Sequence, residues 1–78
     1  MSAGLYVLAP GAVDKQSQHK EDEIYYVVRG RAKMRIGARE SAVAAGCLIF
    51  VEAGTEHRFF DIEQELELLV VFAPAESS

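Results

Sequence analysis

The sequence lacks several features that mark common classes of protein. Its single cysteine, Cys47, excludes an internal disulfide and favours a reducing compartment. No apolar run is long enough to span a bilayer, and Met1 to Gly4 lack the charged and apolar regions of a signal peptide. We therefore expect a cytoplasmic protein that makes no contact with membranes.

Positive charge is also scarce. The 78 residues carry a formal net charge of −4, and the basic residues are interleaved with acids. Because nucleic-acid binding requires a basic patch or stripe, a nucleic-acid partner is not expected. With 50% hydrophobic and 26% charged residues, and no linker or low-complexity tract, the composition predicts one globular domain over residues 1–78.

The dominant pattern is one of short β-strands separated by glycine-marked turns. Runs rich in β-branched and aromatic residues recur along the chain, and no segment has a convincing helical stripe. This pattern predicts an all-β, antiparallel sandwich or small barrel. The expected strands cover residues 4–9, 24–29, 31–36, 39–44, 47–51, 57–60 and 66–72.

The sequence also indicates the form of two connections and the exposure of one strand face. Arg29 and Gly30 separate two of the predicted strands and fit a tight hairpin, while residues 61–65 resemble an acidic loop. The strand after Gly30 alternates cleanly, with Arg31, Lys33 and Arg35 on one face. Together with Arg29 they form a basic stripe that we expect to be solvated, with contact to an anionic substrate as the alternative.

Two predicted strands are apolar on both faces. Residues 47–51 and 66–72 have apolar side chains at odd and even positions, so both faces should be covered. In a small barrel the outer face is wet unless another sheet or chain buries it. We therefore predict a homodimer. Cys47 is expected to pack as a small apolar residue.

Polar residues that suit a metal ion lie in two separate segments. His19 and Glu23 are four positions apart at the entrance to a strand and would share a face if extended. His57 lies between Gly46 and Asp61 in the second segment. Each segment alone is typical of a solvated turn or a strand-edge histidine.

The two segments resemble the signature motifs of the cupin superfamily. Gly11-x5-Ser17-x-His19-x3-Glu23-x6-Gly30 is similar to the first motif, G-x5-H-x-H-x3,4-E-x6-G. Gly46-x5-Glu52-x-Gly54-x2-His57-x3-Asp61 is similar to the second motif, G-x5-P-x-G-x2-H-x3-N. Ser17, Glu52 and Asp61 depart from the family pattern. The resemblance implies a double-stranded β-helix, also called a jelly roll or cupin barrel.

The resemblance also implies a metal site. His19, Glu23 and His57 would bind one divalent metal, such as Fe, Mn, Zn or Ni, whereas Ser17 replaces a fourth ligand. Two imidazoles and a carboxylate with open positions resemble a non-haem iron oxygenase site. The implied function is a small metalloenzyme acting on a small organic molecule, dioxygenase-like first and isomerase or lyase second. The alternative is a site without metal, in a non-enzymatic module that binds or senses a small ligand.

Three further residues are candidates to line a substrate pocket. Tyr25, Met34 and Phe59 share strand faces with Glu23, Ile36 and His57, respectively. Plain core packing is the alternative for each of them. Glu21 is the one nearby carboxylate suited to act as an acid or base, although a surface position is its default. The sequence does not identify catalytic residues.

Overall fold

The structure, a computed structural model, describes residues 1–14 and 20–73. It contains β1 (Ser2–Leu8), β2 (Asp22–Ile36), β3 (Arg39–Ala44), β4 (Leu48–Val51) and β5 (His57–Ala73). All of the strand pairings are antiparallel, and no helix occurs in the two described ranges. The predicted all-β antiparallel fold is confirmed.

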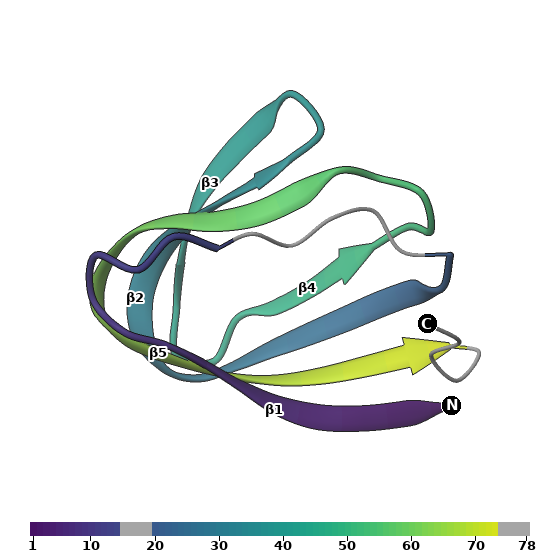
Figure 1. The fold of residues 1–78 in the computed structure, drawn as a ribbon, viewed down its shortest axis with the longest axis horizontal. Helices are drawn as coiled ribbons and strands as arrows, with labels where there is room; N and C mark the ends of the chain where they lie inside the picture. The colour runs from purple at the N-terminus through teal and green to yellow at the C-terminus, as the bar shows by residue number, and fades with distance from the viewer. Residues whose placement is uncertain (15–19, 74–78) are drawn as a thin grey trace.

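Two long, paired strands, β2 and β5, run through both halves of the barrel. β2 pairs with β5 from Asp22 opposite Ala73 to Ile36 opposite His57. Both strands bend midway, so the sheet folds over on itself (Figure 1). One half has the strand order β1-β5-β2-β4, and the other half has the order β5-β2-β3. Each long strand therefore contributes side chains to both halves of one interior.

The predicted hairpin at Arg29 and Gly30 is wrong. β2 continues through both residues, and its pairing with β5 shifts register between Val27 and Lys33. Gly30 has a φ of 100°, and a Cβ there would overlap the backbone of Glu65. The glycine is thus needed because it bends a continuous strand at a close approach between backbones.

The acidic stretch 61–65 is strand rather than loop. β5 runs through it with a left-handed residue, Asp61, at a φ of 49°. Between the pairs Lys33–Phe60 and Arg31–Gln64, β5 advances four residues while β2 advances two, which is a bulge. Sequence patterning missed this strand because bulges interrupt the alternation of apolar side chains.

The basic stripe lies beside acidic side chains of β5. Arg29 contacts Glu65 at 2.8 Å, Arg31 lies 3.7 Å from Glu63, and Lys33 lies 3.7 Å from Asp61. These side chains are between 49% and 65% exposed. The expected solvent exposure is present, but the charges are paired across the strands. Such exposed pairs each contribute little to stability.

Inward-facing side chains of both halves fill the barrel. Val27 of β2, Leu66 and Leu68 of β5 are fully buried, and Ala32 of β2 and Val43 of β3 approach them from the other half. Alternation along each strand explains this arrangement, since every second side chain faces the interior. The remaining buried hydrophobic residues are Leu8, Tyr25, Met34, Val51, Phe59, Ile62 and Val70.

The outer face of the β1-β5-β2-β4 half is apolar and exposed. Strand register aligns Leu5, Leu69, Tyr26 and Leu48 in one row across the four strands. A second row consists of Ala3, Val71, Ile24 and Phe50. We call these two rows the apolar outer face. Leu48 is 71% exposed and Phe50 is 60% exposed, so within this chain β4 is covered on one side only.

A helix with the length and apolar character needed to cross a membrane is not found among the residues placed in the structure.

Candidate metal centre

Glu23 and Tyr25 enter the barrel from the first half of β2. They are two positions apart, so their side chains point to the same side, and each residue is 1% exposed. Ile24 and Tyr26, on the other parity, belong to the apolar outer face. Glu21, just before the strand, is 5% exposed, so its expected position on the surface is wrong. Inward alternation beginning before β2 accounts for this burial.

His57 enters the barrel from the start of β5 and is 2% exposed. Its Nδ1 atom lies 2.9 Å from the backbone carbonyl oxygen of Thr55. Because a carbonyl only accepts hydrogen bonds, Nδ1 carries the proton and donates it. In the neutral ring, the lone pair then lies on Nε2. A backbone contact two residues away thus selects the tautomer and fixes the orientation of the ring.

The Nε2 atom of His57 lies between two groups from β2. It is 3.0 Å from the Tyr25 hydroxyl oxygen and 3.4 Å from Oε2 of Glu23. Since Nε2 holds the lone pair, the Tyr25 hydroxyl donates this hydrogen bond. We call Glu23, Tyr25 and His57 the His57 cluster. It joins residues more than thirty positions apart, brought together by the two halves of the barrel.

The His57 cluster meets two requirements of a metal site. A histidine that binds metal through one nitrogen commonly donates its other N–H to a carbonyl or carboxylate, as His57 does to Thr55. A carboxylate oxygen and an imidazole nitrogen are also ordinary ligands of divalent metals. In the described ranges, however, no three or more His, Cys, Asp or Glu side chains gather at one point. Glu23 and His57 therefore fit as two ligands and need further donors.

One predicted ligand lies outside this geometry. His19 and Ser17 fall within residues 15–19, which are outside the described residues. The structure brings Glu23 and His57 together from separate motifs, as the resemblance implies. The place of His19 in the site stays a prediction.

The three predicted pocket residues lie in the core. Tyr25, Met34 and Phe59 are each 1% exposed, and Met34 is the cross-strand neighbour of Phe59. The rings of Tyr25 and Phe59 meet edge to face, with 5.2 Å between their centroids. Such contacts favour the core interpretation for Tyr25 and Met34.

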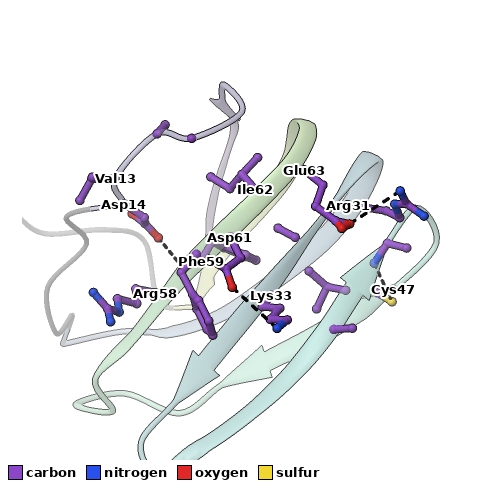
Figure 2. Close-up of a pocket in the computed structure, with 17 residues that line it drawn as sticks. Val13, Asp14, Arg31, Lys33, Cys47, Arg58, Phe59, Asp61, Ile62 and Glu63 are labelled. Atoms are coloured by element: carbon purple, nitrogen blue, oxygen red, sulfur yellow. Dashed lines mark hydrogen bonds and ion pairs between the residues drawn. The ribbon is translucent and has the colours of Figure 1, made fainter.

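An open pocket of about 950 Å³ lies over the second half of the barrel, bounded by residues 11–14, 31–33, 42–44 and 58–63 and by Cys47 (Figure 2). Phe59 lines it, whereas Glu23, Tyr25 and His57 do not. Its rim includes the Lys33–Asp61 and Arg31–Glu63 pairs. Phe59 is the residue that the pocket and the packing around the His57 cluster share.

Asp14 is a structural residue that the sequence did not reveal. It is 5% exposed, and its Oδ2 accepts a hydrogen bond of 2.8 Å from the backbone N–H of Phe59. Its Oδ1 accepts a bond of 3.0 Å from the Tyr6 hydroxyl. The carboxylate therefore ties the segment after β1 to β5, beside the pocket (Figure 2). Neither spacing nor parity indicates this role for an aspartate in a polar stretch.

Comparison with known proteins gives consistent results. The sequence matches the cupin-2 model, described as a cupin domain, over residues 4–72. An uncharacterized protein of Streptomyces coelicolor is 47% identical over 77 residues, which cover 99% of this chain and 73% of that protein.

Solved structures resemble the whole barrel. A cupin-2 domain protein of Rhodospirillum rubrum has a TM-score of 0.87 at 19% identity, over 97% of this chain and 52% of that one. A predicted oxalate decarboxylase of Thermotoga maritima has a TM-score of 0.79 at 25% identity, over 90% of this chain and 63% of that one. The chain thus spans less than two thirds of either structure. Because the family match extends over most of the chain and the fold agrees, this protein belongs to the cupin-2 family of cupin domains.

Proposed function

We propose that this protein is a metal-dependent enzyme that acts on a small organic molecule, with Glu23, His57 and His19 as metal ligands. One observation carries the proposal: Oε2 of Glu23 lies 3.4 Å from Nε2 of His57, and both side chains are 1% exposed. A carboxylate removed from water needs strong compensating interactions. A divalent cation shared with a neutral imidazole is one arrangement that supplies them.

The residues around this pair have separate tasks in the proposed site. The Thr55 carbonyl holds the His57 ring with Nε2 facing Glu23. The Tyr25 and Phe59 rings exclude water from one side of the pair. A metal ion bound there would supply Lewis-acid chemistry or a binding position for dioxygen. Together, these features describe a dry and rigid site of the kind that electrostatic catalysis requires.

The reaction class follows from the ligand set and from one relative. Two histidines and one carboxylate with open positions favour oxygenation, which we retain as the first candidate. The structural likeness to the predicted oxalate decarboxylase supports lyase chemistry as the second. Isomerisation belongs to the same group, because it too relies on a polarised oxygen atom.

Metal analysis of the purified protein tests the proposal. We expect about one divalent ion per chain by elemental analysis, since three ligands define a single site. His57→Ala should abolish metal uptake, and Glu23→Gln should weaken it by about 10-fold or more. Glu56→Gln is the matched control, because Glu56 adjoins His57 in sequence but is exposed. The enzyme proposal fails if no metal copurifies and His57→Ala takes up metal as the wild type does.

A non-enzymatic binding module is the second candidate. The pocket of about 950 Å³ supports it, because none of its lining residues belongs to the His57 cluster. Such a pocket would serve ligand binding without metal chemistry. Small molecules that raise the melting temperature of chelator-treated protein would support this candidate. Stabilisation that requires added metal would instead favour the enzyme.

We further propose that the protein is a homodimer formed through the apolar outer face. Two rows of side chains cross four strands of this face without a charged residue. A standard interface buries about 800 Å² per partner, roughly one sixth of the 4889 Å² surface of this chain. A second copy presents the same exposed apolar face, so a two-fold contact would bury both faces.

A further inference from the structure

We propose that Asp22 is a positioning residue for His57, because its carboxylate holds the turn that orients the imidazole ring. Asp22 is the first residue of β2, and its Oδ1 accepts a hydrogen bond of 2.8 Å from the backbone N–H of Ala53. Ala53 lies in the connection between β4 and β5, just before His57. The inference rests on the proposed function and adds a residue that acts through the backbone.

The turn from Glu52 to Thr55 has a defined shape. The N–H of Thr55 donates to the carbonyl oxygen of Glu52 at 3.1 Å. Gly54, at the third position of the turn, has a φ of 80°, whereas Ala53 at the second position has a negative φ. These values are those of a type II turn, in which the third position favours glycine. The contact within the turn sets its shape but not its place relative to β2.

Asp22 supplies the contact that places this turn beside β2. The pairing of β4 with β2 ends where Val51 lies opposite Glu23, so the turn begins just beyond the last pair. The Asp22 side chain extends the connection by one hydrogen bond to Ala53. A carboxylate accepts a stronger hydrogen bond than a neutral oxygen does. Because the bond lies at the surface, its removal should leave the protein folded.

The carbonyl of Thr55 connects the turn to the imidazole ring. It accepts the hydrogen bond from Nδ1 of His57 at 2.9 Å, and Nε2 of the same ring lies 3.4 Å from Oε2 of Glu23. Asp22 therefore joins the supports of two proposed ligands, since it adjoins Glu23 in the chain and holds the turn that contacts His57. Groups that orient a ligating histidine raise the affinity for metal, because less order is lost on binding.

Zinc affinity, measured by titration calorimetry on metal-free protein, tests this role. Asp22→Ala should bind zinc about 10-fold more weakly than the wild type. Asp22→Asn should restore most of the affinity, because its amide oxygen can accept the same hydrogen bond. Glu52→Ala is the matched control, since it removes one negative charge from an exposed side chain in the same turn. It should bind zinc within about twofold of the wild type, because salt screens exposed charges.

A second measurement reports on the His57 ring without metal. Nitrogen NMR of the imidazole distinguishes the Nδ1–H tautomer from the Nε2–H tautomer, and His57→Ala assigns the signals. We expect the Nδ1–H form in the wild type, Asp22→Asn and Glu52→Ala, and a mixture of both forms in Asp22→Ala. A residue that only stabilised the fold would lower the melting temperature without changing this ratio.

Three results would overturn the inference. In the first, Asp22→Ala keeps the wild-type zinc affinity or the wild-type tautomer. In the second, Asp22→Asn binds zinc as weakly as Asp22→Ala. In the third, Glu52→Ala is as weak as Asp22→Ala, which would mean that the loss of charge alone lowers the affinity.

A measurement on the wild type carries the test if Asp22→Ala fails to fold. Coupling between two sites is reciprocal, so zinc should strengthen the hydrogen bond of Ala53 and slow exchange of its amide proton by about 10-fold. An exchange rate that zinc leaves unchanged would overturn the inference.

The result for His57→Ala separates this inference from the proposed function. If His57→Ala binds zinc as the wild type does, the metal site is wrong, and the tautomer measurement decides whether Asp22 positions the ring. If His57→Ala loses zinc while Asp22→Ala is unchanged, the metal site stands and only the role of Asp22 is wrong.

Discussion

Gly30 of β2 is packed directly against the backbone carbonyl of Glu65 on β5, and a Cβ at Gly30 would overlap that carbonyl and the Cα of Leu66. The φ of Gly30, 100°, also lies in the region that L-residues avoid. Gly30→Ala should therefore lower the free energy of unfolding by about 2–4 kcal/mol, from backbone strain and overlap together. Chemical denaturation measures this change.

The control for this prediction is Gly37→Ala. Gly37 has a positive φ of 58°, but among the described residues beyond its two chain neighbours no atom lies within 4 Å of a Cβ built there. Only the backbone cost applies, so we expect a loss of about 1 kcal/mol. Equal effects of the two substitutions would contradict the close approach of Gly30 to Glu65.

Asp14 should stabilise the protein through its hydrogen bonds with Phe59 and Tyr6. Asp14→Ala leaves the N–H of Phe59 and the hydroxyl of Tyr6 without this acceptor, at a cost of about 2–3 kcal/mol. Asp14→Asn should cost about 1 kcal/mol or less, because the amide oxygen can accept from Phe59 while its NH₂ group donates to Tyr6. Thermal and urea unfolding compare the variants. Equal effects of the two substitutions would contradict the role given to these hydrogen bonds.

The charge pairs between β2 and β5 should contribute little. Lys33→Gln is expected to change stability by about 0.5 kcal/mol or less, because Lys33 and Asp61 are 56% and 65% exposed. Arg29 contacts both Glu65 and Glu67, so Arg29→Gln should have the larger effect, of about 1 kcal/mol at most. Urea unfolding at low and high salt measures both. A loss of several kcal/mol for Lys33→Gln would mean that the pair is far less exposed in solution.

Leu48→Glu should convert the proposed dimer into a monomer. Leu48 lies in the apolar outer face and is 71% exposed in the single chain, so glutamate there disturbs no core contact. Val13→Glu is the control, since Val13 is 72% exposed but lies outside this face. Light scattering at micromolar concentration gives the mass of each variant. A monomeric wild type would remove the basis for the dimer.

The sequence was sufficient to predict the strand-rich fold and most strand positions. The alternation after Gly30 indicates burial of every second residue, as the strand shows, and the apolar run at 47–51 marks β4, although one face of β4 is exposed in the single chain. The prediction of a hairpin at Arg29 was wrong because a glycine indicates a positive φ but does not determine whether the chain reverses or only bends. The prediction of a loop at residues 61–65 was wrong because pairing across a bulge depends on a partner strand, and the local sequence pattern holds no information about that partner.

The candidate site was predictable in part. The motif spacings select Glu23 and His57, and these two residues come together in the barrel although they lie on different strands. The carbonyl of Thr55 is a backbone group, so no side-chain pattern points to it. Tyr25 has the parity of Glu23, but parity alone does not distinguish a core tyrosine from one whose hydroxyl reaches an imidazole. Only the pairing of β2 with β5 provides that distance.

The extended pairing of β2 and β5 also has a kinetic consequence. The two strands are separated by a connection of 20 residues, and they align over nearly their entire lengths. Pairings this distant in sequence close late and slow the folding reaction. Glu23 and His57 meet only when both halves of this ladder are in register. The metal that we propose for this pair should therefore bind after the rate-limiting step, lowering the unfolding rate and leaving the folding rate nearly unchanged.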